Sequence, residues 1–327
     1  EISACLVGSE MCIRDSMTID LNGCGPARGT INSRTIAAAA VPYKMITTPH
    51  EPLNEGGLRA LKVVIDEGNL MMATFPTPMS SWSGPLVAVA DTVLKALAQA
   101  VPDRVPAGHH ATTMGTITLN GTDPANGQRF SSYSVEYGGW GGRPHGDGPS
   151  ARCSVMQGDI RNAPIESMEL KTPVLVWRRA LRQDSGGPGK YRGGLGETLM
   201  VEGLTPANYS LPGARLRGLS PPWGAWGGKE GAIGATYVKL PEEHEFTNKE
   251  HRRLAAPART QAITDCAGGG GWGNPLERAP QAVLEDVLDQ FVSLESARKD
   301  YGVVIDPQTM QLDAHATAEL RVALAGS

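Results

Sequence analysis

Short runs that mix hydrophobic and polar positions recur along the chain, with glycine and proline between them. Runs of four to eight residues rich in β-branched and aromatic side chains, bounded by such punctuation, are typical of β-strands. With 40 glycines and 24 prolines, the intervening loops are long and shaped by glycine. The predicted strands span residues 116–121, 131–139, 173–181, 197–203 and 235–240.

Helical periodicity is clearest at residues 84–101, where apolar residues recur every three or four positions. Asp91 and Lys95 interrupt this run, so it predicts an amphipathic helix over 84–100 and not a membrane span. A second helix is predicted over 280–290, since Pro280 suits a first helical position. The other predictions near the C-terminus are a helix over 293–302 with Ser293 as N-cap and Gly302 as its stop, a strand over 302–306, and a helix over 316–326.

Together these runs predict an α+β fold that is β-rich, with long Gly/Pro-rich loops and a helical C-terminal segment. A net charge of -4 and a pI near 6.0 provide no basic field for nucleic acid or anionic membranes. The five cysteines are an odd number without metal-binding spacing, and no secretory signal is recognisable. We therefore expect a cytoplasmic protein without a nucleic-acid or membrane partner.

Residues 1–16 show no periodicity that joins them to the rest of the chain. The run "CLVGSEMCIRDS" within them resembles translated sequencing-adapter read-through. We predict that 1–16 is a non-native, adapter-derived segment with few contacts to the body, and that the domain occupies 17–327.

The six letters "DSGGPG" at 184–189 match the surroundings of the nucleophile in trypsin-like proteases, with Ser185 in the nucleophile position. That chemistry needs a histidine base oriented by a carboxylate. None of the seven histidines stands in the Ala-Ala-His-Cys setting of that family. A phosphate-binding loop with Lys190 and Arg192 is an alternative, but the nucleotide-binding spacing of glycines and lysine is absent. Tight turns are the simplest interpretation of these glycines.

Three glycine-rich blocks stand in a fixed order: "YGGWGGRPHGDGPSA" (137–151), "DSGGPGKYRGGLG" (184–196) and "AGGGGWGNPLERAPQAVLEDVLDQFVSLESARKDYGVVID" (267–306). Together they closely resemble the hydantoinase B/oxoprolinase family. The spacer at 162–174 and the upstream segments 25–61 and 75–108 fit the same pattern. The resemblance makes "DSGGPG" a family loop and its likeness to a protease motif accidental.

The resemblance implies a subunit or fragment of an ATP-dependent cyclic amide hydrolase that opens hydantoin or 5-oxoproline rings. Phosphorylation of the amide oxygen makes the carbonyl carbon a better electrophile for water. The family implies that a hydantoinase A-type partner subunit handles ATP, so we expect a hetero-oligomer in which this chain handles the activated ring. The alternatives are a subunit of an acetone or acetophenone carboxylase, and a non-catalytic scaffold that shapes an interface.

Family members extend considerably further at the N-terminus, where histidine and aspartate metal ligands are expected. We therefore expect an N-terminally truncated domain, with the ligands of any divalent metal in the part that this sequence lacks. The adjacent residues His109 and His110 are expected to form a surface turn and not a metal site.

Candidate site residues lie in or near the glycine-rich blocks. In "GGRPHGDG", Arg143, His145 and Asp147 are candidates for binding a substrate phosphate or carboxylate, with a solvated turn stabilised by Asp147 as the alternative. Asn54 and Glu55 form either a pocket wall or a turn.

Glu166 is a catalytic candidate, because with Glu169 it would share a helix face and position water or metal. Ion pairs of these glutamates with Arg178, Arg179 or Arg182 are the favoured alternative.

Asp184, Ser185 and Arg192 are the further catalytic candidates. We expect backbone hydrogen bonds to hold their loop, and Asp184 to accept N–H groups of its own turn. Arg192 is expected to fold back toward Asp184 or toward "GGRPHGDG". Ser185 is expected to form a turn or bind a ligand, without a histidine base.

Overall fold

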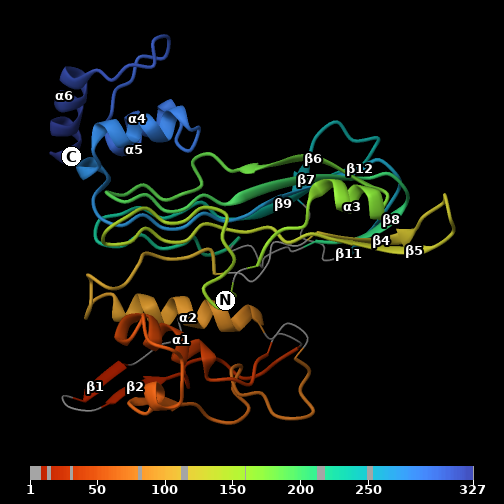
Figure 1. Cartoon of the computed structure of the whole chain (residues 1–327), viewed down its shortest axis with the longest axis horizontal. Helices are drawn as coiled ribbons and strands as arrows, with labels where there is room; N and C mark the ends of the chain where they lie inside the picture. The colour runs from red at the N-terminus through yellow and green to blue at the C-terminus, as the bar shows by residue number, and fades with distance from the viewer. Residues whose placement is uncertain are drawn as a thin grey trace. The chain divides into compact units, whose positions relative to one another are not determined.

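The computed structural model describes residues 9–12, 16–29, 32–79, 83–111, 117–158, 160–211, 218–248 and 253–326. The chain divides into two compact units, residues 1–106 and residues 107–327. Each unit combines strands with helices (Figure 1), so the predicted α+β class is confirmed. Among the described helices, none combines the length and the hydrophobicity that a membrane-spanning helix needs.

The first unit contains a three-stranded sheet of order β1-β2-β3. Strand β2 (Ser16–Asp20) pairs antiparallel with β1 (Ser9–Cys12) and parallel with β3 (Leu61–Val64). Because β1 lies within residues 1–16, part of the adapter-like segment pairs with the sheet; its non-native origin stays a prediction.

Two helices, α1 (Ala37–Thr47) and α2 (Ser83–Leu97), pack against each other in the first unit. Helix α2 confirms the prediction over 84–100, and its apolar stripe is buried at Val89, Val93 and other positions. The short 3-10 helix η1 spans Gly56–Leu58.

The second unit is built on two antiparallel sheets that share one hydrophobic core. The five-stranded sheet has the order β10 (Thr247–Asn248), β9 (Ala235–Lys239), β12 (Thr260–Asp265), β7 (Glu197–Gly203), β6 (Val174–Leu181). The four-stranded sheet has the order β11 (Arg253–Ala256), β8 (Ala207–Ser210), β4 (Thr118–Thr122), β5 (Arg129–Tyr133). Alternate residues of both sheets, such as Leu119, Leu199, Val201 and Tyr209, fill the core between them. Helix α3 (Ile165–Lys171) packs beside β6.

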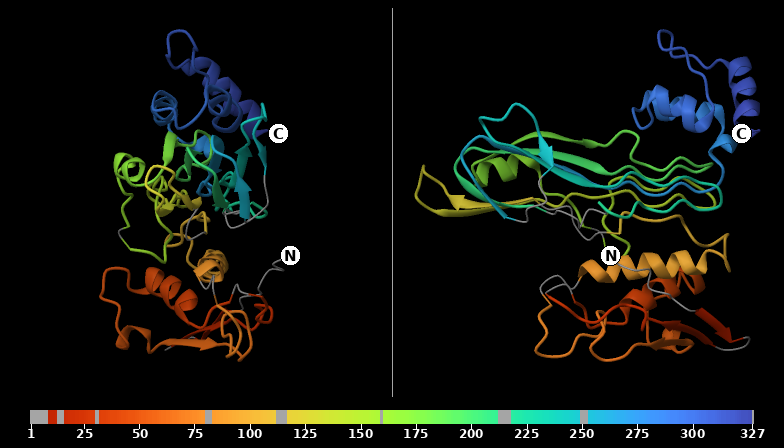
Figure 2. Two further views of the ribbon diagram at one scale, coloured as in Figure 1. Left: turned by 90° about the vertical axis from the view of Figure 1, so that its right-hand side faces the viewer. Right: turned by 180° about the vertical axis from the view of Figure 1, so that it is seen from behind.

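Glycine-rich extended segments continue from the strands and run side by side (Figure 1 and Figure 2). We call these segments the glycine bundle; they are residues 107–111, 137–142, 146–151, 184–189, 191–196, 222–225, 228–233 and 266–272.

The central segment of the bundle bonds to its neighbours with a period of three. The N–H groups of Gly268 and Gly271 donate to the segment 228–233, at the carbonyls of Ala232 and Lys229. Those of residues 269 and 272 donate to the segment 191–196, and that of residue 270 donates to Gly108. A polyproline II helix has three residues per turn and no internal hydrogen bonds. In such a helix, successive residues face different directions and bond to different neighbouring segments.

Close approach of the backbones explains why the bundle needs glycine. A Cβ at Gly269 would overlap the carbonyl oxygen of Trp140, and one at Gly139 would overlap that of Gly194. Backbone atoms cannot move aside as the end of a flexible side chain can, so a side chain at either position excludes the neighbouring segment.

Three helices follow the bundle: α4 (Pro280–Leu288), α5 (Leu294–Tyr301) and α6 (Ala314–Ala325), after the short 3-10 helix η3 (Pro275–Glu277). The predicted caps are confirmed, because the side chain of Ser293 accepts the N–H of Ser296 and Gly302 has a φ of 62°. The strand predicted over 302–306 is wrong. Val303 and Ile305 instead pack with α4 and α5 in a small core, and only an isolated bridge links Ile305 to Leu312.

Candidate functional site

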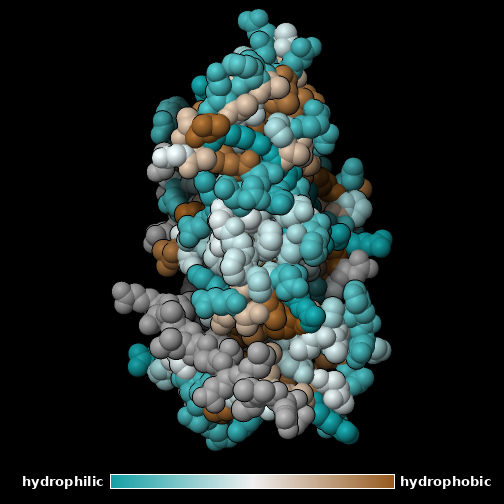
Figure 3. All heavy atoms as spheres, turned by 90° about the vertical axis from the view of Figure 1, so that its left-hand side faces the viewer, coloured by the Kyte–Doolittle hydropathy of each residue, from teal (hydrophilic) through white to brown (hydrophobic). Residues whose placement is uncertain are grey.

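The turns of the glycine bundle that lie farthest from the strands meet at one end, which we call the tip; it comprises residues 143–147, 190, 225–228 and 273. The N–H of Lys190 donates to the carbonyl of Gly273 at 3.1 Å, and the N–H of Gly273 to that of Ala225 at 2.9 Å. Figure 3 looks onto this end, where pale residues of intermediate hydropathy fill the middle of the face and hydrophilic residues flank them.

Arg143 and His145 project from the turn of the hairpin formed by 137–142 and 146–151. The backbones of Arg143 and Gly146 exchange hydrogen bonds of 2.9 and 3.3 Å. The guanidinium of Arg143 donates to the backbone carbonyl of Asp147 at 3.1 Å, and both Arg143 and His145 are exposed. The hairpin thus ends in an exposed turn that leaves a cation accessible.

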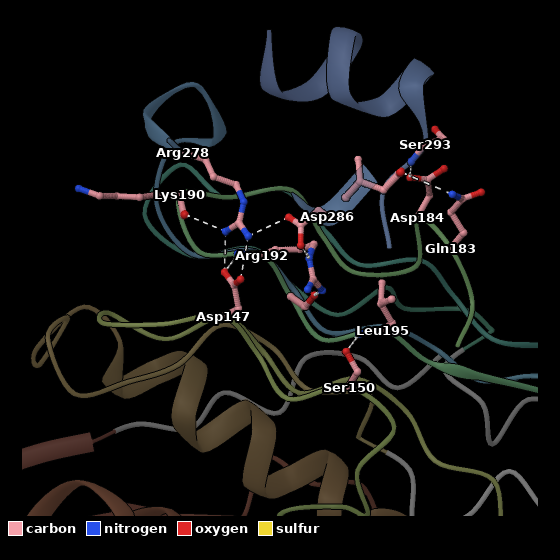
Figure 4. A network of polar contacts seen from close by, with 12 residues as sticks. Asp147, Ser150, Gln183, Asp184, Lys190, Arg192, Leu195, Arg278, Asp286 and Ser293 are labelled. Atoms are coloured by element: carbon pink, nitrogen blue, oxygen red, sulfur yellow. Dashed lines mark hydrogen bonds and ion pairs between the residues drawn. The ribbon is translucent and has the colours of Figure 1, made fainter. Parts of the chain in front are cut away.

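Asp147 belongs to a network of charges whose other members, Arg192, Arg278 and Asp286, are buried (Figure 4). Arg278 donates from Nη1 to Oδ1 of Asp147 at 2.6 Å and from Nη2 to Oδ2 at 2.8 Å, and the backbone N–H of Arg192 donates to Oδ1 at 2.7 Å. Asp286 of α4 lies 2.8 Å from Nη2 of Arg278 and accepts a bond of 3.2 Å from Nε of Arg192. Two arginines and two aspartates alternate, so the network carries no net charge.

Burial and ion pairing have opposite effects on the pKa values of the two aspartates in this network. Burial alone would raise the pKa of Asp147, but the hydrogen bonds and charge of Arg278 outweigh it and hold that pKa below its ordinary value. The pKa of Asp286 stays raised because burial exceeds the lowering effect of Arg192 and Arg278. The buried phenol of Tyr301 next to them also has a raised pKa, chiefly through burial. A buried network of this kind joins segments of the chain in one geometry, and removing one member leaves an uncompensated charge.

The network changes the roles expected for Asp147 and Arg192. Asp147 was a substrate-binding candidate, yet its carboxylate is engaged by Arg278. Arg192 does turn its backbone toward "GGRPHGDG", but its side chain pairs with Asp286 and lies over the ring of Phe291, not toward Asp184. Both residues therefore attach the C-terminal helices to the glycine bundle.

Asp184 makes a long-range contact where a local one was expected. Its carboxylate accepts the N–H of Ser293 at 2.8 Å, and its own N–H donates to the carbonyl of Phe291 at 3.0 Å. The expectation that it caps its own turn is wrong: Asp184 has a φ of 59°, and its carboxylate bonds to the loop before α5.

Ser185 is completely buried and its hydroxyl is fully engaged within the chain. Its Oγ donates to the carbonyl of Arg182 at 2.5 Å and accepts the N–H of Gly196 at 2.9 Å. This is the geometry of a turn former, as expected, and no ligand-facing role follows from it. A nucleophile requires a base at its hydroxyl proton, and here a backbone carbonyl holds that proton.

The remaining candidates lie outside the tip. Glu166 is exposed in the first turn of α3. The expected ion pairs with arginine are wrong for Glu169, which accepts the backbone N–H of Val176 at 2.8 Å, while Arg179 pairs with Glu197. Asn54 and Glu55 belong to the first unit, where the carboxamide of Asn54 accepts the N–H of Gly57 at 2.8 Å. They form an exposed turn.

His109 and His110 are buried, so the expected surface turn is wrong. The ring of His109 stacks on that of Trp140 with a centroid distance of 5.2 Å, and Nδ1 of His109 accepts the N–H of Gly141 at 3.1 Å. His110 packs directly against Gly138. Across the described part of the chain no three His, Cys, Asp or Glu side chains converge to hold a metal ion.

Several buried charged residues were not recognised in the sequence. Arg278 and Asp286 of the network stand in the third glycine-rich block, but no local pattern indicates their partners. Glu136 and Glu197 lie directly beside glycine segments and are also buried. The described residues that line an open groove of about 450 Å³ over β4, β8 and β11 are Asn, Gly, Thr, Pro and Ala, and none of them is titratable.

Comparison with known proteins gives consistent matches. The family model described as hydantoinase B/oxoprolinase matches residues 7–275. The beta chain of the caprolactamase of Pseudomonas jessenii is 35% identical over 301 residues, covering 88% of this chain and 51% of the relative. The B component of a candidate D-/L-hydantoinase of Pseudomonas sp. (strain NS671) is 34% identical, covering 83% and 45%. The chain thus spans about half the length of these relatives.

The fold also matches solved structures. The crystal structure of the ATP-dependent caprolactamase from Pseudomonas jessenii aligns with a TM-score of 0.79 and 29% identity, covering 94% of this chain and 55% of that one. A nucleotide-free acetone carboxylase structure aligns with a TM-score of 0.81 at 20% identity, covering 97% and 48%, a likeness of fold alone.

Proposed function

Because this chain belongs to the hydantoinase B/oxoprolinase family, we propose that it is a subunit or fragment of an ATP-dependent cyclic amide hydrolase. In the overall reaction a lactam, ATP and water yield the ring-opened amino acid, ADP and phosphate. This chain acts on the activated lactam, and a hydantoinase A-type partner in a cytoplasmic hetero-oligomer handles ATP. The 35% identity to the caprolactamase beta chain over 88% of this chain is the observation that carries the proposal.

The glycine bundle supports a role for its tip in holding an anionic group of the activated substrate. Arg143 presents an accessible guanidinium, whose planar fork suits a phosphate or carboxylate. Behind it, the pair of Asp147 and Arg278 fixes the base of the hairpin. We assign the direct contact with substrate to Arg143 and His145, and a positioning role to Asp147 and Arg192.

A scaffold function is a second candidate, and it has its own observation. The polar groups of Asp184, Ser185 and Arg192 all have partners within the chain, as expected if this region only shapes an interface. A carboxylase subunit is the other alternative, favoured by the 25% identity to the acetone carboxylase alpha subunit of Xanthobacter autotrophicus over 90% of this chain.

A chimera tests the proposal directly. Residues 17–327 replace the aligned stretch of the caprolactamase beta chain, and the chimera is purified with the ATP-handling partner. We expect lactam-dependent ATP hydrolysis with ring opening, and its loss in Arg143→Ala. Ring opening that is unchanged in Arg143→Ala supports the scaffold. ATP hydrolysis dependent on a ketone and bicarbonate, without ring opening, supports the carboxylase.

A further inference from the structure

The end of the glycine bundle opposite the tip, where its segments leave the strands, contains a cluster of buried titratable side chains. Glu136 precedes the first glycine-rich block, Glu197 follows the second, and Cys266 precedes the third. Their exposed fractions are 0%, 5% and 0%. We call this cluster the root; each of the three blocks begins or ends beside one of its residues.

Glu197 is the root residue whose carboxylate has defined partners. Its carboxylate pairs with Nε of Arg179 on β6 and accepts the backbone N–H of Tyr137 at 3.1 Å. The backbone bonds follow the same path, since Glu197 donates to the carbonyl of Tyr137 and accepts the N–H of Cys266. One arginine thus neutralises one glutamate.

Glu136 is the unmatched member. Neither of its carboxyl oxygens has a well-formed hydrogen bond to any described residue, although Ser134 and the backbone of Ile117 lie close. Burial raises the pKa of Glu136 to about 8, and the charge of Glu197 adds to this effect, whereas Ser134, Arg179 and the backbone of Ile117 oppose it. The thiol of Cys266 also has a raised pKa, through burial and then the charge of Glu136. Arg182 is a further cation near Cys266, and it donates to the backbone carbonyl of that residue at 3.2 Å. Of the two root glutamates, Glu197 is the one that forms an ion pair with an arginine.

The three blocks beyond the root are joined in a closed cycle of backbone hydrogen bonds. The N–H of Gly139 donates to Ala267 at 3.0 Å, that of Gly269 to Gly194 at 2.9 Å, and that of Gly194 to Trp140 at 2.8 Å. Each block donates to another, so movement of one block at the root strains the bonds of the other two.

We infer that Glu136 is a proton-dependent joint: its neutral carboxyl keeps the three glycine-rich blocks together at the root, and its ionisation loosens them. The charge would face Glu197 on β7, Arg179 on β6, Cys266 after β12, and Tyr137 on its own segment, with His110 packed against Gly138 nearby. Asp265 and Arg182 also act on Cys266. Of the two permanent cations, Arg179 is engaged by Glu197, and Arg182 donates to the backbone carbonyls of Ile233 and Cys266. Opening of the root exposes the new charge to water, so ionisation favours the open state.

The pH dependence has a definite sign. A carboxyl whose pKa is raised by folding stabilises the closed root fully below its ordinary pKa of 4.5, and this stabilisation is lost as the pH rises to about 8. Each pH unit between those values corresponds to about tenfold in the opening equilibrium. Acidic pH therefore favours the closed bundle.

Hydrogen exchange of the intact chain tests the inference. After correction for intrinsic exchange, protection of the Gly139, Gly194 and Gly269 amides is expected to fall up to about tenfold per pH unit between about pH 5 and 8. Glu136→Gln, a neutral isostere, is expected to remove this dependence. The control Glu242→Gln, at an exposed turn after β9, is expected to behave like the wild type.

Two results would overturn the inference. One is an equal pH dependence in the wild type and Glu136→Gln. The other is an equal loss of protection at core positions such as Leu119 and Tyr209, which indicates global unfolding and not a local joint. If Glu136→Gln does not fold, the carboxyl ¹³C titration of Glu136 in the wild type decides. A midpoint near pH 8 supports the joint, and one near the ordinary value of 4.5 excludes it.

Discussion

Arg278 holds Asp147 through both terminal nitrogens of its guanidinium, at 2.6 and 2.8 Å, although the two residues lie 131 positions apart in the chain. Bidentate pairing of this kind fixes direction as well as distance. Asp147 belongs to the hairpin at the tip, and Arg278 stands directly before α4. This pair thus ties the C-terminal helices to the glycine bundle.

Replacing Arg278 by Met is expected to destabilise the second unit strongly. Asp147 and Asp286 then keep a partly buried negative charge that Arg278 no longer compensates. Breaking a fully buried ion pair lowers the free energy of unfolding by about 3–5 kcal/mol. Because the side chain of Asp147 is 34% exposed, we expect the lower end of that range. Urea denaturation measures the change. Lys190→Met, which breaks the exposed pair with Glu277, is the matched control and is expected to cost less than about 1 kcal/mol.

Asp147→Asn is expected to reveal the acid dependence of the same pair. The pKa of Asp147 is lowered in the folded chain, so its contribution is present above the ordinary value of 3.8 and is lost as the pH falls through the lowered value. The stability difference between Asp147→Asn and the wild type should therefore be constant from about pH 5 upward and shrink below pH 4. A difference that stays unchanged down to pH 2 would contradict this role of the charge.

Gly269→Ala is expected to disrupt the glycine bundle, because the new methyl group would overlap the carbonyl of Trp140. Overpacking in a core commonly costs about 1–3 kcal/mol, and a rigid backbone neighbour places this site at or above the upper end. Thermal unfolding of Gly269→Ala and of Gly158→Ala should differ accordingly, since a Cβ at Gly158 meets nothing within 4 Å. Equal melting temperatures would refute the close packing.

Local signals in the sequence predicted local structure well. Ser293 and Gly302 indicate the ends of α5 because capping depends on a few neighbouring residues. The run 197–203 became β7 with the same bounds. Helix α1 was not predicted, since Pro42 lies inside it and proline normally ends a helix.

Long-range partners could not be predicted in the same way. The glycine-rich blocks were recognised as a family signature. Their hydrogen bonding with a period of three residues, however, depends on neighbours that are distant in the sequence. For the same reason Asp184 was assigned a partner in its own turn, whereas its carboxylate accepts the N–H of Ser293. Arg192 was expected to turn toward Asp184 or "GGRPHGDG"; its backbone bonds to Asp147 of that block, but its side chain pairs with Asp286. Residue type indicated that these side chains accept or donate, and only the fold determines to which group.

Ser185→Ala distinguishes a structural serine from a nucleophile. Its hydroxyl links Arg182 to Gly196, and removing it leaves the buried N–H of Gly196 unsatisfied. We therefore expect a loss of about 1–3 kcal/mol in stability.

If the proposed function holds, folded Ser185→Ala in the complex with an ATP-handling partner is expected to open the lactam ring at a reduced but measurable rate. Loss of a nucleophile would instead abolish ring opening while folding and assembly remain intact. Ser154→Ala, at another buried serine of the second unit, serves as the control for the general effect of removing a buried hydroxyl. Because the proton of Ser185 is donated to a backbone carbonyl that cannot act as a base, a complete and specific loss of turnover would require a rearrangement of this loop in the complex, and would refute the structural role.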